Sequence, residues 1–88
     1  MNTSIKDKFP VLARSVRFTK YMMFIRLSDG REIGIPLEWF PALSSAKPEQ
    51  LKKWKLIGNG IGIHWDELDE DILVEPLLKP HYYLVGSH

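Results

Sequence analysis

The sequence contains no cysteine and no long hydrophobic run. Without cysteine the chain cannot form disulfides, thiolate metal sites or a cysteine nucleophile, and this composition is typical of proteins from a reducing cytoplasm. No stretch reaches the roughly 18 consecutive apolar residues of a membrane-spanning helix. The polar residues 1–8 are not followed by the apolar segment of a signal peptide. We therefore expect a cytoplasmic protein that does not contact a membrane.

The chain also has little net charge, but its charges are unevenly distributed. Its 88 residues are enough for one domain, and 44% of them are hydrophobic, which is too many for an intrinsically disordered chain. Residues 1–55 carry 11 basic and 5 acidic side chains, whereas residues 56–88 carry 1 basic and 6 acidic side chains. The two halves either neutralise each other in the folded domain or present a basic and an acidic face to different partners.

The first part of the chain has the pattern of an antiparallel β-meander. Strands are expected at residues 11–18, 21–27 and 32–36. The pair Asp29-Gly30 lies between the second and third strands and favours a tight hairpin turn. Alternation along these strands predicts one buried face, formed by Met23, Ile25, Leu27, Ile33, Ile35 and Leu37.

The remainder is predicted to form shorter elements. A single helical turn is expected between Pro36 and Pro41, and Pro48 favours a short central helix over 47–54. Further elements are one strand or two half-strands at 55–65, an acidic turn at 66–71, a strand or the start of a helical turn at 72–74, and a packed turn at 75–78. The predicted fold is therefore α+β, with a flexible N-terminal arm at 1–9, a single domain at 10–79 and a C-terminal tail at 80–88.

Three features suggest catalytic or cofactor sites but lack the spacing that such sites need. The glycine-rich segment 58–62 fits neither G-x-G-x-x-G nor the Walker loop, so we interpret it as a bulge or a kink with close backbone approach. His64 precedes several acids without a known metal-binding pattern, which favours a structural hydrogen bond. No serine stands in a G-x-S-x-G elbow. We expect no catalytic residue, cofactor or metal; a hydrolytic or metal-assisted activity at His64 is a competing hypothesis.

Five blocks of the sequence resemble one known family. They are D-G-R at 29–31, P-L-E-W-F-P-A-L at 36–43, A-x-P-E-Q-L-K-K-W at 46–54, L-I-G-N-G-I-G-I-H-W at 56–65 and L-D-E-D-I-L-V-E-P-L-L at 68–78. In them the chain resembles the small bacterial domain-of-unknown-function family number 2442. The resemblance implies a short cytoplasmic α+β protein, encoded beside a second short protein in an antitoxin-like pair, without an established set of catalytic residues. The chain departs from the family pattern at Pro76, where Gly is frequent, and in its tail.

Together these observations predict a binding module that is not an enzyme. We expect it to dock a partner protein as the antitoxin-like or regulatory half of a bacterial two-gene pair, through complementary charge with a basic partner. The residues predicted to bind the partner are Trp65, Asp66, Glu67, Asp69, Glu70 and Asp71. A phage or mobile-element protein that inhibits a host defence complex through an acidic surface would have the same sequence features.

A second alternative is nucleic-acid binding through the first hairpin. Its basic residues alternate with aromatic ones, as in sheets that bind single strands; they are Arg14, Arg17, Lys20, Arg26 and Arg31. The same charges also protect a sheet edge from pairing with another chain. Four bulky residues are suited either to the core or to an interface: Trp39, Phe40, Trp54 and Trp65.

Overall fold

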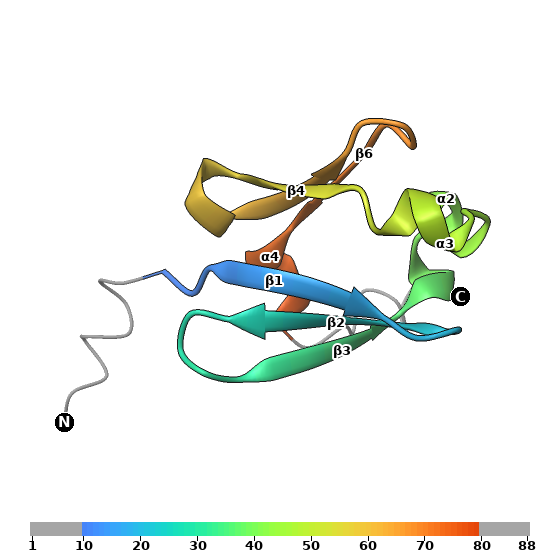
Figure 1. Ribbon diagram of the computed structural model, residues 1–88. Coiled ribbons are helices and arrows are strands. Elements are labelled where there is room, and N and C mark those ends of the chain that lie inside the picture. The colour runs from blue at the N-terminus through green and yellow to red at the C-terminus, as the bar shows by residue number, and fades with distance from the viewer. Residues whose placement is uncertain (1–9, 80–88) are drawn as a thin grey trace, which may run out of the picture.

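The computed structural model describes residues 10–79, which form two three-stranded antiparallel sheets and a few short helices (Figure 1). The first sheet has the order β1-β2-β3, with β1 at Ala13–Phe18, β2 at Met22–Leu27 and β3 at Glu32–Pro36. The second has the order β4-β5-β6, with β4 at Trp54–Ile57, β5 at Gly62–Trp65 and β6 at Glu70–Leu73. The fold is thus mixed α+β. The arm predicted at 1–9 and the tail predicted at 80–88 lie outside the described residues.

The first sheet is the predicted meander. Ile25 of β2 pairs with Val16 of β1 on one side and with Ile33 of β3 on the other. The turn after β2 is closed by the Leu27 N–H, which donates to the Arg31 carbonyl at 2.7 Å. All six positions predicted for the buried face are buried or half-buried, which confirms the predicted alternation: Met23, Ile25, Leu27, Ile33, Ile35 and Leu37.

Short helical turns connect the two sheets. They are η1 at Leu37–Trp39, α2 at Pro41–Ser44 and α3 at Pro48–Leu51. The turn predicted between Pro36 and Pro41 is present as η1, but the central helix predicted over 47–54 is wrong in extent, because α3 is a single turn. Trp54 pairs with Trp65 across the β4–β5 hairpin, so the backbone must become extended soon after Leu51. Strand pairing in the second sheet therefore ends the helix.

The segment predicted at 55–65 folds as two strands. β4 and β5 are separated by η2 at Gly58–Gly60, where Gly60 has a φ of +113°. A Cβ atom at position 60 would lie 2.3 Å from the carbonyl oxygen of Ala13, so only glycine permits this approach of the hairpin loop to β1. The predicted kink with close backbone approach is confirmed, and it joins the two sheets.

The hydrophobic core includes residues of both sheets, and Trp65 is the largest side chain in it. The Trp65 indole N–H donates to the Leu51 carbonyl at 2.9 Å, and the Phe18 ring packs edge-on against the indole at 6.5 Å between ring centres. After β6 the chain forms α4 at Val74–Leu77, whose first and last residues are buried in the same core. None of the helices formed by residues 10–79 is long and apolar enough to span a membrane.

Candidate functional site

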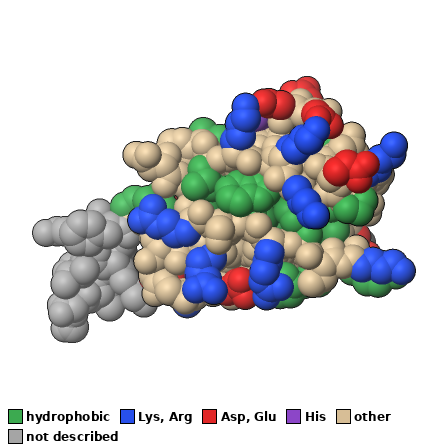
Figure 2. Space-filling model, viewed as in Figure 1, with side chains coloured by type: hydrophobic (Ala, Val, Ile, Leu, Met, Phe, Trp, Pro, Cys, Tyr) green, Lys and Arg blue, Asp and Glu red, His purple; other side chains and the backbone are tan. Residues whose placement is uncertain are grey.

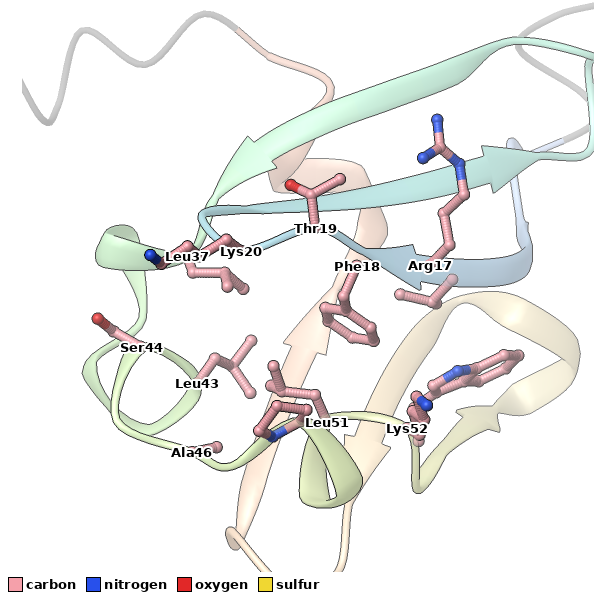
Figure 3. Close-up of a pocket in the computed structure, with 13 residues that line it drawn as sticks. Arg17, Phe18, Thr19, Lys20, Leu37, Leu43, Ser44, Ala46, Leu51 and Lys52 are labelled. Carbon is pink, nitrogen blue, oxygen red and sulfur yellow. The ribbon is translucent and has the colours of Figure 1, made fainter.

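A groove of about 650 Å³ lies between the C-terminal half of β1, the α2 and α3 turns, and the start of β4 (Figure 3). Its wall is apolar and is contributed by segments far apart in the sequence: Val16, Phe18, Leu37, Leu43, Leu51 and Trp54. In Figure 3 the Phe18 ring points into the groove, whereas the Arg17 side chain points away from it. Because α2 and α3 are one turn each, they cover only part of the space beside β1.

The polar residues at the groove are basic or hydroxylic. Lys20 and Lys52 stand at its rim with Thr19 and Ser44, and no acidic side chain is among the described residues that line it. Neither lysine forms an ion pair within residues 10–79. On the face shown in Figure 2, apolar side chains lie between the two sheets and Lys and Arg side chains flank them. The site therefore combines an apolar wall with unneutralised positive charge.

The predicted acidic surface is largely neutralised from within the domain. Lys55 donates to Asp66 at 2.6 Å and Lys53 donates to Glu67 at 2.7 Å. These lysines lower the pKa of the two carboxyls, and His64 adds to the effect on Asp66. Each pair joins the basic part of the sequence to the acidic part, so the folded halves neutralise each other here.

Trp65 was predicted among the partner-binding residues, and the structure corrects this assignment. Its side chain is 1% exposed, because it sits on the inner face of β5, so it belongs to the core and is not available for contact with a partner. Of the five acids, Asp69 and Glu70 are the two that form no ion pair with another described residue. The open negative charge of the loop is therefore smaller than its sequence suggests.

His64 lies on β5 between two carboxylates. Its Nε2 is 2.7 Å from Asp66, and its Nδ1 is hydrogen-bonded to Asp71. The hydrogen bond to Asp71, followed by the one to Asp66, raises the pKa of His64 above its usual value. Within residues 10–79 no three His, Asp or Glu side chains are grouped so that they could hold a metal ion. His64 is not part of the wall of the groove.

The basic residues of the first hairpin are only partly brought together: the register places Arg17 and Arg26 on one face of the sheet, with Glu32 between them. Arg17 forms a bidentate pair with Glu32 at 3.0 and 3.1 Å, and its guanidinium lies 4.3 Å from the centre of the Phe24 ring. One face of the Phe24 ring is thus covered by Arg17. Arg31 pairs with Asp29 at 2.8 Å, in the turn at the opposite end of β2 from Lys20. Arg14 and Arg26 are exposed strand residues.

Sequence reasoning did not find the groove. The sequence predicts Lys20 as a nucleic-acid contact and leaves Trp54 open between core and interface, but it does not relate the two residues to one site. One local signal was present: Pro41 and Pro48 each begin a helical turn, and both turns are short enough to leave β1 partly uncovered.

Two solved structures resemble this fold. A crystal structure of a protein of unknown function from Rhodospirillum rubrum is 25% identical, with a TM-score of 0.70 over 80% of this chain and 87% of that one. A solution NMR structure of an uncharacterized protein from Chromobacterium violaceum is 21% identical, with a TM-score of 0.68 over 94% of this chain and 81% of that one. No curated protein matches the sequence. The family model described as "Protein of unknown function (DUF2442)" matches residues 13–83, and the chain therefore belongs to this family.

Proposed function

We propose that the chain is a protein-binding module that docks its partner in the groove beside β1, as the regulatory or antitoxin-like half of a cytoplasmic bacterial pair. The observation that carries this proposal is the combination of an apolar wall with Lys20 and Lys52, which have no acidic partner in residues 10–79. Apolar contact supplies affinity at protein interfaces, and rim charges select the partner and speed its association. The partner then presents apolar side chains flanked by acidic ones.

The earlier hypothesis of an acidic docking loop has less support. Lys53, Lys55 and His64 already bind three of its carboxylates, so a basic partner would have to displace these contacts. The same reasoning weakens a mimic of nucleic acid that inhibits a defence complex. Nucleic-acid binding by the hairpin is also less favoured, because Glu32 and Asp29 neutralise Arg17 and Arg31.

A small organic ligand fits the groove less well than a protein segment. The volume of about 650 Å³ lies within the usual range of ligand pockets. Such pockets direct several polar groups at the ligand to fix its orientation, whereas here the hydroxyls of Thr19 and Ser44 and the two lysines stand around an apolar wall. Apolar side chains of a partner match this wall better.

The proposal is tested by purifying the tagged full-length chain, with its binding partners, from its own bacterial host. We compare the wild type with a Lys20→Glu/Lys52→Glu variant and with an Arg14→Glu/Lys79→Glu control of equal charge change at exposed positions outside the groove. The wild type and the control should retain the same partner, and the groove variant should lose it. Recovery of the same proteins by all three chains would refute docking in the groove.

A further inference from the structure

We propose that the partner binds as an extended, acidic segment that adds to the open edge of β1. This inference rests on the proposed docking groove and specifies how it is occupied. Strand addition uses backbone hydrogen bonds for affinity and alternate side-chain pockets for selectivity. It requires an edge strand whose outward N–H and C=O groups are accessible beside a surface that can receive side chains.

β1 is the edge strand beside the groove. Among the described strands it pairs only with β2. The Thr19 N–H donates to the Met22 carbonyl at 2.9 Å, which places Thr19 in a hydrogen-bonded pair. Hydrogen-bonded and non-hydrogen-bonded pairs alternate along an antiparallel ladder, so the register makes Arg17 the next bonded residue toward the start of β1. The N–H and C=O groups of Val16 and Phe18 therefore point away from β2.

These two residues also line the groove, so the open edge and the apolar wall belong to one site. At the other end of β1 the edge is covered by the β4–β5 loop. The Gly60 backbone lies so close to Ala13 that a Cβ atom at position 60 would be 2.3 Å from the Ala13 carbonyl oxygen. The unpaired edge runs over Val16–Phe18, about 10 Å at 3.3 Å per residue, with Val16 8% exposed and Phe18 half-buried. This length suits a segment of about four residues.

The surroundings of this edge define the chemistry of the segment. Alternate side chains of an added strand point to opposite faces, so one set would contact the half-buried side chains of the apolar wall, Phe18 and Trp54. The other set would lie toward the rim, where Lys20 and Lys52 favour carboxylates. We infer a segment in which branched or aromatic residues alternate with Asp or Glu.

The same lysines disfavour pairing of this edge with a second copy of itself. An accessible edge promotes aggregation unless charge or shape blocks it, and lysine is frequent at protected edges. Two copies of β1 placed edge to edge would bring Lys20 and Lys52 of both copies, which have no acidic partner within residues 10–79, into one interface, which is repulsive. An acidic segment is attracted by the same lysines. Their positive charge therefore both disfavours self-pairing and selects an acidic partner.

The test selects peptides from a random display library on the full-length chain, then adds a synthesised binder to the ¹⁵N-labelled protein. The selected peptides should alternate apolar and acidic residues. Amide hydrogen exchange of Val16 and Phe18 should slow by about tenfold or more on binding. A Val16→Pro variant, which loses an N–H that points away from β2 and has its φ fixed by the proline ring, should bind about fivefold to tenfold more weakly.

The outcomes separate the two proposals. If peptides lose affinity for the Lys20→Glu/Lys52→Glu variant while the exchange of Val16 and Phe18 in the wild type is unchanged, strand addition is wrong and the docking groove stands. Selected peptides with apolar residues three and four apart, the spacing of a helix, would also mean that strand addition is wrong and that the docking groove stands. If no peptide is sensitive to the two lysine changes, both proposals are wrong. The exchange measurement uses the wild type, so it decides the question even if Val16→Pro does not fold.

Discussion

Gly60 and Ala13 join the two sheets at a distance that only a glycine allows. The missing Cβ would lie 2.3 Å from the Ala13 carbonyl oxygen and 3.0 Å from the Ala13 nitrogen, and the φ of Gly60 is +113°. Since Ala13 begins β1, this contact fixes the strand that forms one side of the groove relative to the sheet that contains Trp54. The position of the groove thus depends on two backbones in direct contact.

Replacing Gly60 by alanine should destabilise the protein strongly. The substitution combines strain at positive φ with a clash against backbone that cannot move aside, and we expect a loss of about 3 to 4 kcal/mol in the free energy of unfolding. Gly30→Ala is the matched control, because Gly30 has a φ of +95° with no atom within 4 Å of the added Cβ. It should cost only the strain, about 1 kcal/mol. Urea denaturation of both variants provides the comparison, and equal losses would show that the contact with Ala13 is unimportant.

Trp65→Phe should lower stability without removing a partner contact. The change removes the hydrogen bond to Leu51 and part of a side chain that is 1% exposed, so we expect a loss of about 2 to 3 kcal/mol. Trp54→Phe, at a half-buried position, should cost less, about 1 kcal/mol. Thermal or urea unfolding measures both. If Trp54→Phe lowered the free energy of unfolding more than Trp65→Phe, the assignment of Trp65 to the core and of Trp54 to the groove would be wrong.

The stability of the domain should depend on pH through His64. Asp71 and Asp66 raise the pKa of His64 in the folded state above 6.5, so protonation favours the fold. This contribution is fully present below pH 6.5 and is lost as the pH rises through the raised folded-state pKa. The melting temperature should therefore fall over this interval in the wild type and change less in His64→Gln. A wild-type curve parallel to that of His64→Gln would contradict the assignment.

Asp71→Asn should lower the pKa of His64, because the hydrogen bond to Asp71 is the main cause of its elevation. The ring signals of His64 in an NMR titration report this shift directly. Asp69→Asn is the control: Asp69 forms no ion pair within residues 10–79, and it should leave the titration unchanged. Equal shifts in both variants would mean that the general charge of the loop, and not the specific contact, sets the pKa of His64.

Neutralising the open acids of the loop should not affect partner binding. Asp69→Asn/Glu70→Gln removes the two carboxylates of the loop that form no ion pair within residues 10–79, and the loop does not line the groove. The affinity for the partner purified from the host should therefore equal that of the wild type in calorimetry. A loss of affinity of tenfold or more, about 1.4 kcal/mol, would show that the acidic loop binds the partner.

Local patterns predicted the parts of the fold that depend on neighbouring residues. The Asp29-Gly30 turn and the alternation around Ile25 predicted the meander because a hairpin brings sequence neighbours together. The helix predicted over 47–54 was too long, since the pairing of Trp54 with Trp65 is a longer-range interaction that overrides local helical preference. The exposure of Trp65 could not be judged from its acidic neighbours, because alternation along β5 turns its side chain inward.

The site was harder to predict than the fold. Val16, Leu43 and Trp54 belong to three different elements and meet only when the two sheets pack, so no spacing in the sequence relates them. The acidic run was conspicuous in the sequence, but its neutralisation by Lys53 and Lys55 depends on the register of the β4–β5 hairpin. In this protein a run of like charges in the sequence therefore predicts the binding site less well than the charged side chains that have no ion-pair partner within residues 10–79.

Chemical-shift mapping of the ¹⁵N-labelled chain with its purified partner tests the docking groove most directly. The indole N–H of Trp54 and the amides of Thr19 and Ser44 report on the groove, whereas the amides of Asp69 and Glu70 report on the acidic loop. We predict that the partner shifts the first three signals and leaves the last two unchanged. Shifts confined to the loop, with the Trp54 indole unchanged, would contradict the account.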